Sequence, residues 1–311
     1  MKRADQISRR LRLKDLHTLQ IIAELGSMAK ASHQLALSQP AISKAVSEME
    51  RTVGTALLDR SSRGVELTES GKLLLGRARN IFDEVRQGIE DIAAASDPTQ
   101  GEVRIGAAET LTVVLSEIIG HLVRKYPRIR YSITISDGDS LNRDLRERKL
   151  DVVFRRWLPV PDADDLKVEV AFKQALGVLA ERSHPLLRRK KLQLADLMEE
   201  QWALSPEDSF LGRVVADVFA RRNLPLPPAV VRTVSVYMRM SLLASGKFIS
   251  VLPLTMLQQP FGGWLRPLSV ELSDSAAPIA LITLKKRQPS GPLRIFRQAS
   301  LEICKRFALA S

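Results

Sequence analysis

From Glu102 to the end of the chain, short strand-like apolar runs alternate with segments whose apolar residues recur at helical spacing. The run Val103–Ala107 precedes the helical segment Thr110–Lys125, and Tyr131–Ile135 precedes Ser140–Lys149. Alternation of this kind is typical of α/β sheets with helices on both faces. About 210 residues are more than one small sheet needs, so the pattern predicts two sheets, which bind ligands at the carboxyl ends of their strands.

The remaining segments continue the alternation. The pattern predicts strands within Asp151–Phe154, Leu166–Ala180, Trp202–Leu204, Val230–Thr233, Ile249–Leu252 and Ile279–Leu284, and helices near Leu194–Glu200, Leu211–Arg222, Ser235–Ser245 and Pro292–Ala308. Residues 96–101, with the sequence Ser-Asp-Pro-Thr-Gln-Gly, interrupt all periodicity in front of the first strand and are predicted to form a linker.

The N-terminal part of the chain has helical periodicity. The first helix is expected over Asp15–Leu25; Ser27 is expected to cap a second helix and Ser38 a third, which Gly54 ends. The face of the third helix opposite its apolar stripe carries Gln39, Pro40, Ser43, Lys44 and Ser47. Such a pair of helices with a polar outer face predicts a helix-turn-helix, whose second helix enters the major groove of DNA. The alternative is a helical hairpin with a solvated face.

Two short strands are expected at Leu57–Asp59 and Val65–Thr68, on either side of a basic turn. A basic hairpin directly after the third helix is what a winged helix-turn-helix needs. Thr68 is then expected to cap a long helix that runs to about Ala95. This helix carries a heptad-like stripe made of Leu74, Ala78, Ile81, Val85, Gly88 and Ile92. A second copy of the helix is the expected partner of the stripe, and packing on the later domain is the alternative.

The chain is strongly basic, with 47 Lys and Arg against 35 Asp and Glu, a net charge of +12 and an isoelectric point near 10.1. This balance indicates an anionic partner, most often nucleic acid. The excess is present both in residues 1–64 and in residues 97–311, so charge alone does not locate the site. Basic runs such as Arg188-Arg189-Lys190-Lys191 are typical of solvated faces or loops.

Several classes of protein are disfavoured. The lone cysteine, Cys304, rules out an internal disulfide and every metal motif built on cysteine pairs. Neither a secretory signal nor an apolar run of membrane length is present, so the chain is expected to be soluble and cytoplasmic. Gly106 is followed by Ala-Ala-Glu-Thr-Leu, not by a glycine-rich phosphate loop, and no nucleophile elbow or HExxH motif occurs. No catalytic residue, metal ligand or cofactor is therefore expected.

Residues 26–71 carry a specific pattern. Its core is Ser38-Gln39-Pro40-Ala41-Ile42-Ser43-Lys44, followed by Glu50, Gly54, Leu57, Arg60, Arg63-Gly64, Leu67-Thr68 and Gly71. This stretch resembles the N-terminal signature of LysR-type transcriptional regulators. Weaker matches continue in order through Val103–Gly106, Tyr126-Pro127, Leu150–Val153, His184–Leu186 and Val251–Pro253. The resemblance thus covers essentially the whole chain.

Two residues depart from the family pattern inside the helix-turn-helix. Ser32 stands where the family usually has a small alanine, and its hydroxyl is expected to bond a carbonyl one turn earlier. Ala36 stands where the family has glycine or a polar residue. If the turn needs a left-handed residue, alanine is a strained choice.

The resemblance implies an α+β multidomain protein. Its parts would be a winged helix-turn-helix domain at 1–67, a linker and dimerisation helix at 68–96, and a periplasmic-binding-protein-like effector domain at 97–311. The effector domain would hold two Rossmann-like subdomains, the first formed by 102–157 plus 266–311 and the second by 164–262. Such proteins are typically homotetramers, dimers of dimers, that bind interrupted palindromes in promoter DNA and respond to a small co-inducer. RNA polymerase is a further candidate partner.

For DNA binding, the resemblance and the helix pattern together select eight residues. Gln39 is expected to pair with adenine, and Lys44 to donate to guanine as a point charge where the family often has arginine. Ser43 is expected to face the base edges with them, and Ser38 and Pro40 belong to the start of the same helix. Ser27, Arg60 and Arg63 are expected to contact phosphates, as residues that position the domain without reading sequence.

The effector site is expected at Thr110, Ser140, Arg155, Arg156, Ser205 and Ser235, in the cleft between the two subdomains. Helix N-termini at Thr110, Ser140 and Ser235 would direct free amides into the cleft, which suits an anion or a polyol. An arginine at the first crossover would hold a carboxylate with two hydrogen bonds. The alternative for these arginines is a surface salt bridge with Asp162, Asp164 or Asp165. A rival for the whole chain is an α/β ligand-binding protein of solute-binding type without DNA function, which would leave residues 15–68 unexplained.

Overall fold

Local capping determines where the N-terminal helices begin and end. The computed structural model describes residues 10–61, 64–157, 163–258, 260–272 and 276–308. Its first helices are α2 (Leu13–Leu25), α3 (Met28–Leu35) and α4 (Gln39–Val53). The Ser27 hydroxyl accepts the Lys30 amide and the Ser38 hydroxyl accepts the Ala41 amide, as expected. Gly26 and Gly54 end α2 and α4 in the left-handed conformation.

The turn between α3 and α4 depends on a strained residue. Ala36 has φ 52° and ψ 39°, so this turn does need a left-handed residue. The Leu37 amide donates to the Ser32 carbonyl at 3.0 Å, and the Ser32 hydroxyl donates to the Ala29 carbonyl at 2.8 Å. The departure at Ser32 is therefore absorbed locally, whereas the departure at Ala36 remains as backbone strain.

The wing is hydrogen-bonded to α4 and to the residue that ends α2. Strands β1 (Leu58–Ser61) and β2 (Gly64–Leu67) pair antiparallel, each displaced by one residue from its expected start. A Glu50 carboxylate oxygen accepts the amides of Leu57 and Leu58 at 2.9 and 3.2 Å, which joins the end of α4 to the start of the wing. The Val65 amide donates to the Gly26 carbonyl at 3.1 Å.

Helix α5 (Glu69–Ser96) begins at Thr68, as expected, where the hydroxyl accepts the Gly71 amide at 3.0 Å. The Thr68 amide donates to the Leu57 carbonyl, and a Cβ at position 71 would overlap that carbonyl oxygen. Along the expected stripe Ala78 is fully buried, whereas Ile81, Val85 and Ile92 are 41%, 46% and 75% exposed. Ile81, Val85 and Ile92, in the second half of the stripe, are thus exposed among the described residues.

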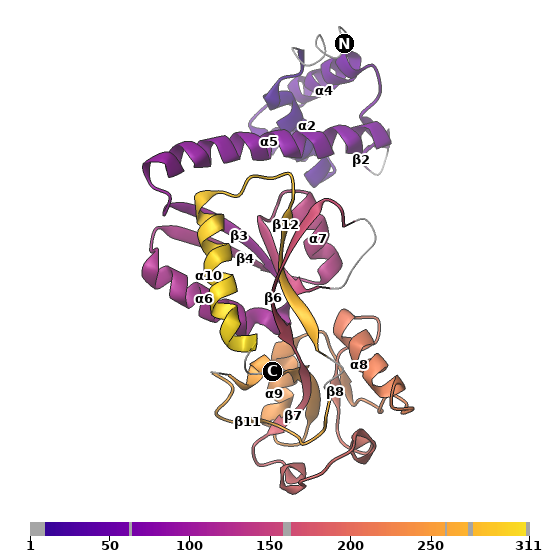
Figure 1. The fold of residues 1–311 in the computed structure, drawn as a ribbon. Helices are drawn as coiled ribbons and strands as arrows, with labels where there is room; N and C mark the ends of the chain where they lie inside the picture. Colours follow the sequence, from indigo (N-terminus) through magenta and orange to yellow (C-terminus); the bar gives the residue numbers. More distant parts are fainter. Residues whose placement is uncertain (1–9, 62–63, 158–162, 259, 273–275, 309–311) are drawn as a thin grey trace. The chain divides into compact units, whose positions relative to one another are not determined.

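The chain divides into two units, Met1–Ile89 and Glu90–Ser311. In the second unit the larger sheet has the order β4-β3-β5-β12-β6; α6 and α10 cover one of its faces and α7 covers the other (Figure 1). Its elements are β3 (Gly101–Ala107), α6 (Thr112–Lys125), β4 (Ile129–Ile135), α7 (Gly138–Arg146), β5 (Val152–Arg156), β6 (Leu166–Gln174), β12 (Ala277–Leu284) and α10 (Gly291–Ala308). Strand β3 is parallel to β4 and β5, and β12 is antiparallel to β5 and β6. We call this part subdomain I.

Subdomain II contains a three-stranded sheet of order β10-β7-β11 and the parallel pair β8-β9. Its main elements are β7 (Leu176–Glu181), β8 (Ala203–Leu204), α8 (Phe210–Ala220), β9 (Val231–Arg232), α9 (Val236–Ala244), β10 (Ile249–Pro253) and β11 (Leu265–Pro267). Buried Trp202 and Phe219 lie edge to face in its core, with ring centroids 5.9 Å apart. Short 3-10 turns replace the helix expected near Leu194–Glu200 and precede α6 at Glu109–Leu111.

The subdomain boundaries differ from the expected ones. Residues 164–174 were expected in the second subdomain, but β6 pairs with β12 over its whole length and belongs to subdomain I. Residues from 266 onward were expected in the first, but β11 pairs with β7, and Leu268 and Leu272 are buried in the core of subdomain II. The expectation was wrong because the chain crosses between sheets at Ala175, where no turn signal separates β6 from β7.

No described helix combines the length and the apolar composition that a membrane span requires.

Candidate functional site

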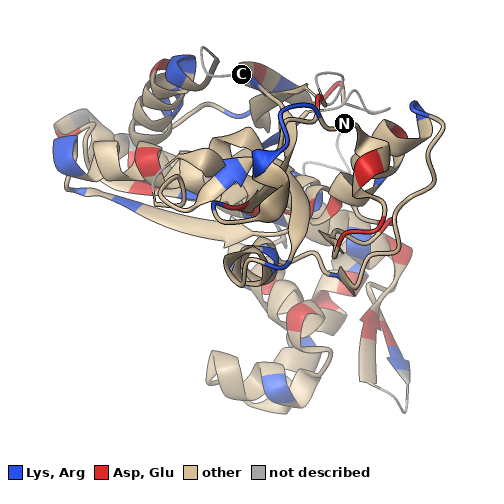
Figure 2. Cartoon of the chain, turned by 90° about the horizontal axis from the view of Figure 1, so that it is seen from below, with Lys and Arg blue, Asp and Glu red and all other residues tan. Residues whose placement is uncertain are grey.

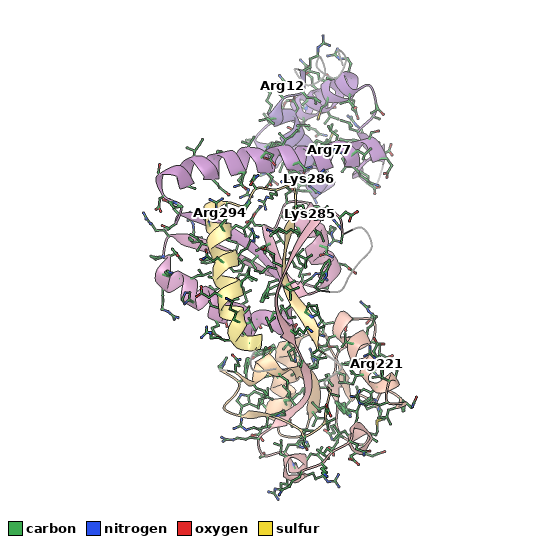
Figure 3. All side chains as sticks on the ribbon, in the orientation of Figure 1. Arg12, Arg77, Arg221, Lys285, Lys286 and Arg294 are labelled. Carbon is green, nitrogen blue, oxygen red and sulfur yellow. The ribbon has the colours of Figure 1, made fainter. Side chains whose placement is uncertain are left out.

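Charge alone does not locate a site on this molecule. Basic and acidic residues are interspersed along the described helices and strands (Figure 2). The basic side chains labelled in Figure 3 come from both units: Arg12 and Arg77 from the first, Arg221, Lys285, Lys286 and Arg294 from the second. The sites must therefore be found from local geometry.

The outer face of α4 is exposed and carries polar side chains. Gln39 and Lys44 are exposed, and neither has a side-chain partner among the described residues. The opposite face is fixed in the core by Ile42 and Val46, both fully buried. The helix is thus anchored on one side and presents donors and acceptors on the other, at the N-terminal end that helix-turn-helix proteins use for base contacts.

Ser27, Ser38 and Pro40 also stand near helix starts. Each serine oxygen accepts a backbone amide as a cap, which leaves its hydroxyl hydrogen able to donate to a phosphate. Pro40 occupies the first turn of α4, where a missing amide hydrogen costs nothing. These residues set where α4 begins.

The wing reaches the face of α4 through one arginine. Arg60, exposed on β1, donates from Nη1 to the Ser43 hydroxyl at 3.4 Å. Ser43 is half-buried as a result, and the two residues form one continuous polar surface. Arg63, expected in the wing, lies outside the described residues.

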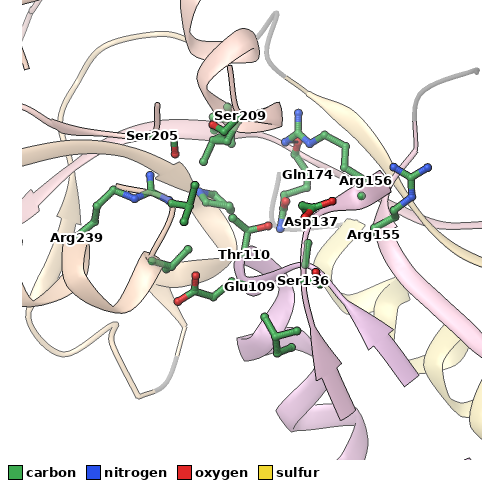
Figure 4. Close-up of a pocket in the computed structure, with 18 residues that line it drawn as sticks. Glu109, Thr110, Ser136, Asp137, Arg155, Arg156, Gln174, Ser205, Ser209 and Arg239 are labelled. Atoms are coloured by element: carbon green, nitrogen blue, oxygen red, sulfur yellow. Dashed lines mark hydrogen bonds between the residues drawn. The ribbon is translucent and has the colours of Figure 1, made fainter. Parts of the chain in front are cut away.

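A cavity of about 380 Å³ lies in the second unit, lined by residues of both subdomains (Figure 4). Its lining residues are Ala108, Glu109, Thr110, Ile135, Ser136, Asp137, Gly138, Arg155, Arg156, Gln174, Leu176, Ser205, Ser209, Leu211, Val234, Val236, Arg239 and Pro253. Thr110 and Gly138 follow strands β3 and β4, so the cavity lies at the carboxyl ends of the parallel strands, as such sheets predict. Four of the six expected residues line it: Thr110, Arg155, Arg156 and Ser205.

Ser140 and Ser235 are not among the lining residues, because both serve helix starts. Helix α7 begins at Gly138, and the Asp137 carboxylate accepts the amides of Asp139 and Ser140 at 3.1 and 2.8 Å. Ser235 accepts the Met238 amide at the start of α9. The expectation of free amides at these two N-termini was wrong, since the chain's own side chains cap them.

Helix α9 has a second capping partner, from the other subdomain. The Tyr237 amide donates to Glu109 Oε1 at 3.1 Å. Glu109 belongs to the turn after β3 and lines the cavity. A carboxylate of subdomain I thus already occupies the anion-binding N-terminus of α9.

Arg155 and Arg156 are the last residues of β5, not part of a crossover, and each is only 8% exposed. Arg156 Nη2 donates to the Gln174 carbonyl at 3.2 Å, and the Arg155 guanidinium lies 5.9 Å from the Trp157 ring centroid. Burial lowers the pKa of Arg156 to about 10, so its charge persists at neutral pH.

The alternative of a surface salt bridge does not fit these arginines, because both are buried. Asp165 instead accepts Arg146 Nε and Nη2 at 2.8 and 2.9 Å. Asp162 lies outside the described residues. The acidic group whose charge acts on the Arg155 pKa is Asp139, and burial lowers that pKa more than Asp139 raises it.

The sequence analysis missed Arg239, a third arginine of the cavity. It is 1% exposed, and burial lowers its pKa to about 10 although the charge of Glu109 opposes the shift. A signal was present: Arg239 falls on the buried stripe of α9 with Val236, Met240 and Leu243. A charged residue on an apolar stripe needs either a partner or a ligand.

Two family models match the chain. The model described as "Bacterial regulatory helix-turn-helix protein, lysR family" matches residues 13–72, and "LysR substrate binding domain" matches residues 96–305. Together they account for both the α4 face and the cavity. A solute-binding protein without DNA function would leave the first match unexplained.

Curated relatives and solved structures agree with this division. The regulator GbpR of Rhizobium radiobacter is 30% identical over 246 residues, 76% of this chain and 80% of GbpR. PcaQ of Agrobacterium fabrum is 25% identical over 299 residues, 95% of this chain and 96% of PcaQ. A variant of full-length OxyR from Pseudomonas aeruginosa superposes with a TM-score of 0.69 at 20% identity, covering 95% of both chains. Full-length CbnR, solved with its target DNA, gives 0.54 at 23%, covering 94% of this chain and all of CbnR.

Proposed function

The chain belongs to the LysR family of bacterial transcriptional regulators, and on that premise we propose that a small anion bound in the cavity controls how the α4 face engages promoter DNA. A member of this family is a DNA-binding regulator with an effector-binding domain, not an enzyme. It acts on DNA, so the cytoplasm is its proposed location. The finer assignments concern particular residues, the effector and the assembly.

We propose that Gln39 and Lys44 read base edges. Both side chains are exposed and unpaired among the described residues, and both stand at the N-terminal half of α4. Gln39 pairs with adenine through two hydrogen bonds, and Lys44 donates to guanine. Ser43 lies on the same face toward the base edges, Ser27, Arg60 and Arg63 hold phosphates, and Ser38 and Pro40 set the start of the helix.

We propose an anion as the effector, and one observation carries this proposal. Three arginines, Arg155, Arg156 and Arg239, are each at least nine-tenths buried around one cavity. Buried cations are retained where an anion or a fixed partner compensates them. Thr110 and Ser205 add hydroxyl groups at the same lining.

We propose a dimer of dimers as the working assembly. The support is the stripe on α5, where Ile81, Val85 and Ile92 are exposed although apolar. Pairing of two such helices places two α4 faces on one DNA duplex, as an interrupted palindrome requires. RNA polymerase bound at the same promoter is a further proposed partner.

The test is a footprint on the DNA upstream of the protein's own gene, with and without a panel of organic acids and their neutral analogues. We expect a protected interrupted palindrome whose extent or strength changes with an acid. A protein that binds cognate and random duplexes equally at physiological salt, or that responds to neutral compounds only, contradicts the proposal.

A further inference from the structure

The three arginines of the cavity differ in which donors the protein already uses. Arg156 donates to the Gln174 carbonyl. In Arg155, Nε and Nη2 are both sealed from the cavity without a partner among the described residues, and Nη1 lies 2.7 Å from where a Cβ on Gly138 would stand. Arg155 can therefore offer a ligand only Nη1, unless its side chain moves.

Arg239 is arranged differently. Its Nη1 donates to the Val251 carbonyl at 3.2 Å, and neither Nε nor Nη2 has a hydrogen-bond partner among the described residues. Figure 4 shows the side chain directed from α9 toward Ser205 and Thr110. Nε of Arg239 is sealed like that of Arg155, so Nη2 is the free donor that can reach a carboxylate with a charge-assisted hydrogen bond.

Other arginines of the same chain hold carboxylates through Nη2 together with Nε. Nε and Nη2 of Arg104 donate to the two oxygens of Asp151, and those of Arg146 donate to the two oxygens of Asp165. In Arg239 Nη1 holds the side chain in place and Nε is sealed, so Nη2 is the donor left for a carboxylate.

The rest of the lining limits what such an acid can be. Apolar side chains contribute much of the wall, namely Ile135, Leu176, Leu211, Val234, Val236 and Pro253. Three guanidinium groups face two carboxylates, those of Glu109 and Asp137, so a single negative charge balances the lining. A cavity of about 380 Å³ also leaves room for a body well beyond an inorganic anion.

We propose that the effector is a monocarboxylic acid with an apolar body, and that Arg239 holds its carboxylate while Glu109 opposes it. This rests on the proposed function of the cavity as the effector site. The apolar body lies against the wall formed by Leu176, Leu211 and Val236. Glu109 and the effector carboxylate compete for the same positive region, so Glu109 sets how tightly the acid binds.

The experiment uses calorimetry on the full-length protein with four probes that differ in one feature each. Octanoate carries one carboxylate, octanamide none, suberate two on the same chain length, and gluconate one on a polar body. We expect octanoate to bind at least tenfold more tightly than any of the other three. Equal binding of octanamide, tighter binding of suberate or gluconate, or no binding of octanoate overturns the proposed class.

Variants test whether Arg239 holds the carboxylate, separately from which class of acid binds. Arg239→Gln should weaken octanoate binding ten- to a hundredfold and leave octanamide unchanged, with Arg239→Lys between them. Arg266→Gln is the matched control, because Arg266 is exposed and its Nη1 also donates to backbone carbonyls. Full octanoate affinity in Arg239→Gln contradicts the proposal that Arg239 holds the carboxylate.

Glu109→Gln tests the same site without changing Arg239, so the test still works if the Arg239 variants fold poorly. It should strengthen octanoate binding about three- to tenfold and leave octanamide unchanged. Unchanged octanoate affinity in this variant contradicts the opposing role of Glu109. Should suberate or gluconate alter the DNA footprint while octanoate does not, the cavity remains an effector site and only the class proposed here fails.

Discussion

Ala36 carries the clearest residue-scale strain in the helix-turn-helix. Its left-handed backbone costs a residue with a Cβ about 1–2 kcal/mol, and glycine would avoid that cost. The structure tolerates alanine because the turn is held from both sides, by the Ser38 cap and by the Leu37 amide on the Ser32 carbonyl.

We expect Ala36→Gly to raise the free energy of unfolding by about 0.5–1 kcal/mol. The released strain exceeds the extra entropy that glycine gives the unfolded chain, about 0.4–1 kcal/mol. Chemical denaturation of the full chain measures it. Ala29→Gly, inside α3 with an ordinary helical backbone, is the control and should destabilise by about 1 kcal/mol. A loss of stability in both variants would contradict the strain argument.

We expect Gln39→Ala to weaken binding to the cognate site by about 1–3 kcal/mol and to leave binding to random duplex DNA nearly unchanged. The reason is that Gln39 is exposed without a partner among the described residues, so its amide is free to pair with a base. Fluorescence anisotropy at fixed salt on both duplexes measures the difference. Gln34→Ala on the exposed face of α3 is the control. Equal losses on cognate and random DNA would show that this face does not read bases.

Some residue-scale features depend on neighbours in the sequence, and others depend on residues far away in the chain. The caps Ser27, Ser38 and Thr68 were predictable because a cap depends on neighbours three residues away. The place of Arg239 on the apolar stripe of α9 could have been read from the sequence, but its proximity to Glu109 could not, because Glu109 stands far from it in the chain. The expectation of free amides at Ser140 was wrong for a local reason. Asp137, three residues earlier, accepts the Ser140 amide, and the sequence could have indicated this cap.

At the scale of elements, one carboxylate joins three parts of subdomain I. Asp151, just before β5, accepts the Arg104 amide of β3 at 2.7 Å and Arg287 Nη2, beyond β12, at 2.7 Å. Its side chain is 6% exposed. Burial raises the pKa of Asp151, and the two arginines together lower it further than burial raises it, so the folded-state pKa lies below its ordinary value of 3.8.

We expect Asp151→Asn to destabilise the protein by about 3–5 kcal/mol, because it leaves two arginines without their shared carboxylate. The carboxylate's contribution is complete above pH 3.8 and is lost as the pH falls through the lowered folded-state pKa. The variant should therefore lose less stability than the wild type on acidification below pH 3.8. Thermal unfolding across pH 2–7 tests this. Asp165→Asn, in an exposed pair with Arg146, should cost at most about 1 kcal/mol.

Element boundaries show where sequence patterns stop being informative. The strands of subdomain I were predictable because each is a short apolar run bounded by turns. Leu166–Ala180 was expected as one segment, yet it supplies β6 to one sheet and β7 to another. The first half alternates apolar and polar residues and the second is nearly all apolar, but no turn signal separates them at Ala175. The pairing partners β12 and β10 therefore decide which sheet each half joins. Strand β11, three residues long, carries no periodicity to detect.

At the scale of the whole molecule, we expect the Ile81→Glu, Val85→Glu double variant to convert the proposed dimer into monomers and to abolish specific DNA binding. In this variant, pairing of α5 would bury two unpaired glutamate charges per chain. Sedimentation velocity measures the assembly. The control is the Lys72→Gln, Gly76→Glu double variant, which changes the net charge by the same amount at exposed positions away from the stripe. It should sediment like the wild type. Dimers of unchanged stability in the first variant would refute the pairing.

The close packing at Gly71 bears on how far apart the two α4 faces lie in the proposed dimer. A Cβ at position 71 would collide with the Leu57 carbonyl, and Thr68 bonds the backbone of both Ala56 and Leu57. The start of α5 is therefore packed and hydrogen-bonded against the wing. In the proposed dimer, a rotation of one α5 relative to its partner would carry the α4 face with it, so the crossing angle of the two helices would set the distance between the two proposed base-reading surfaces.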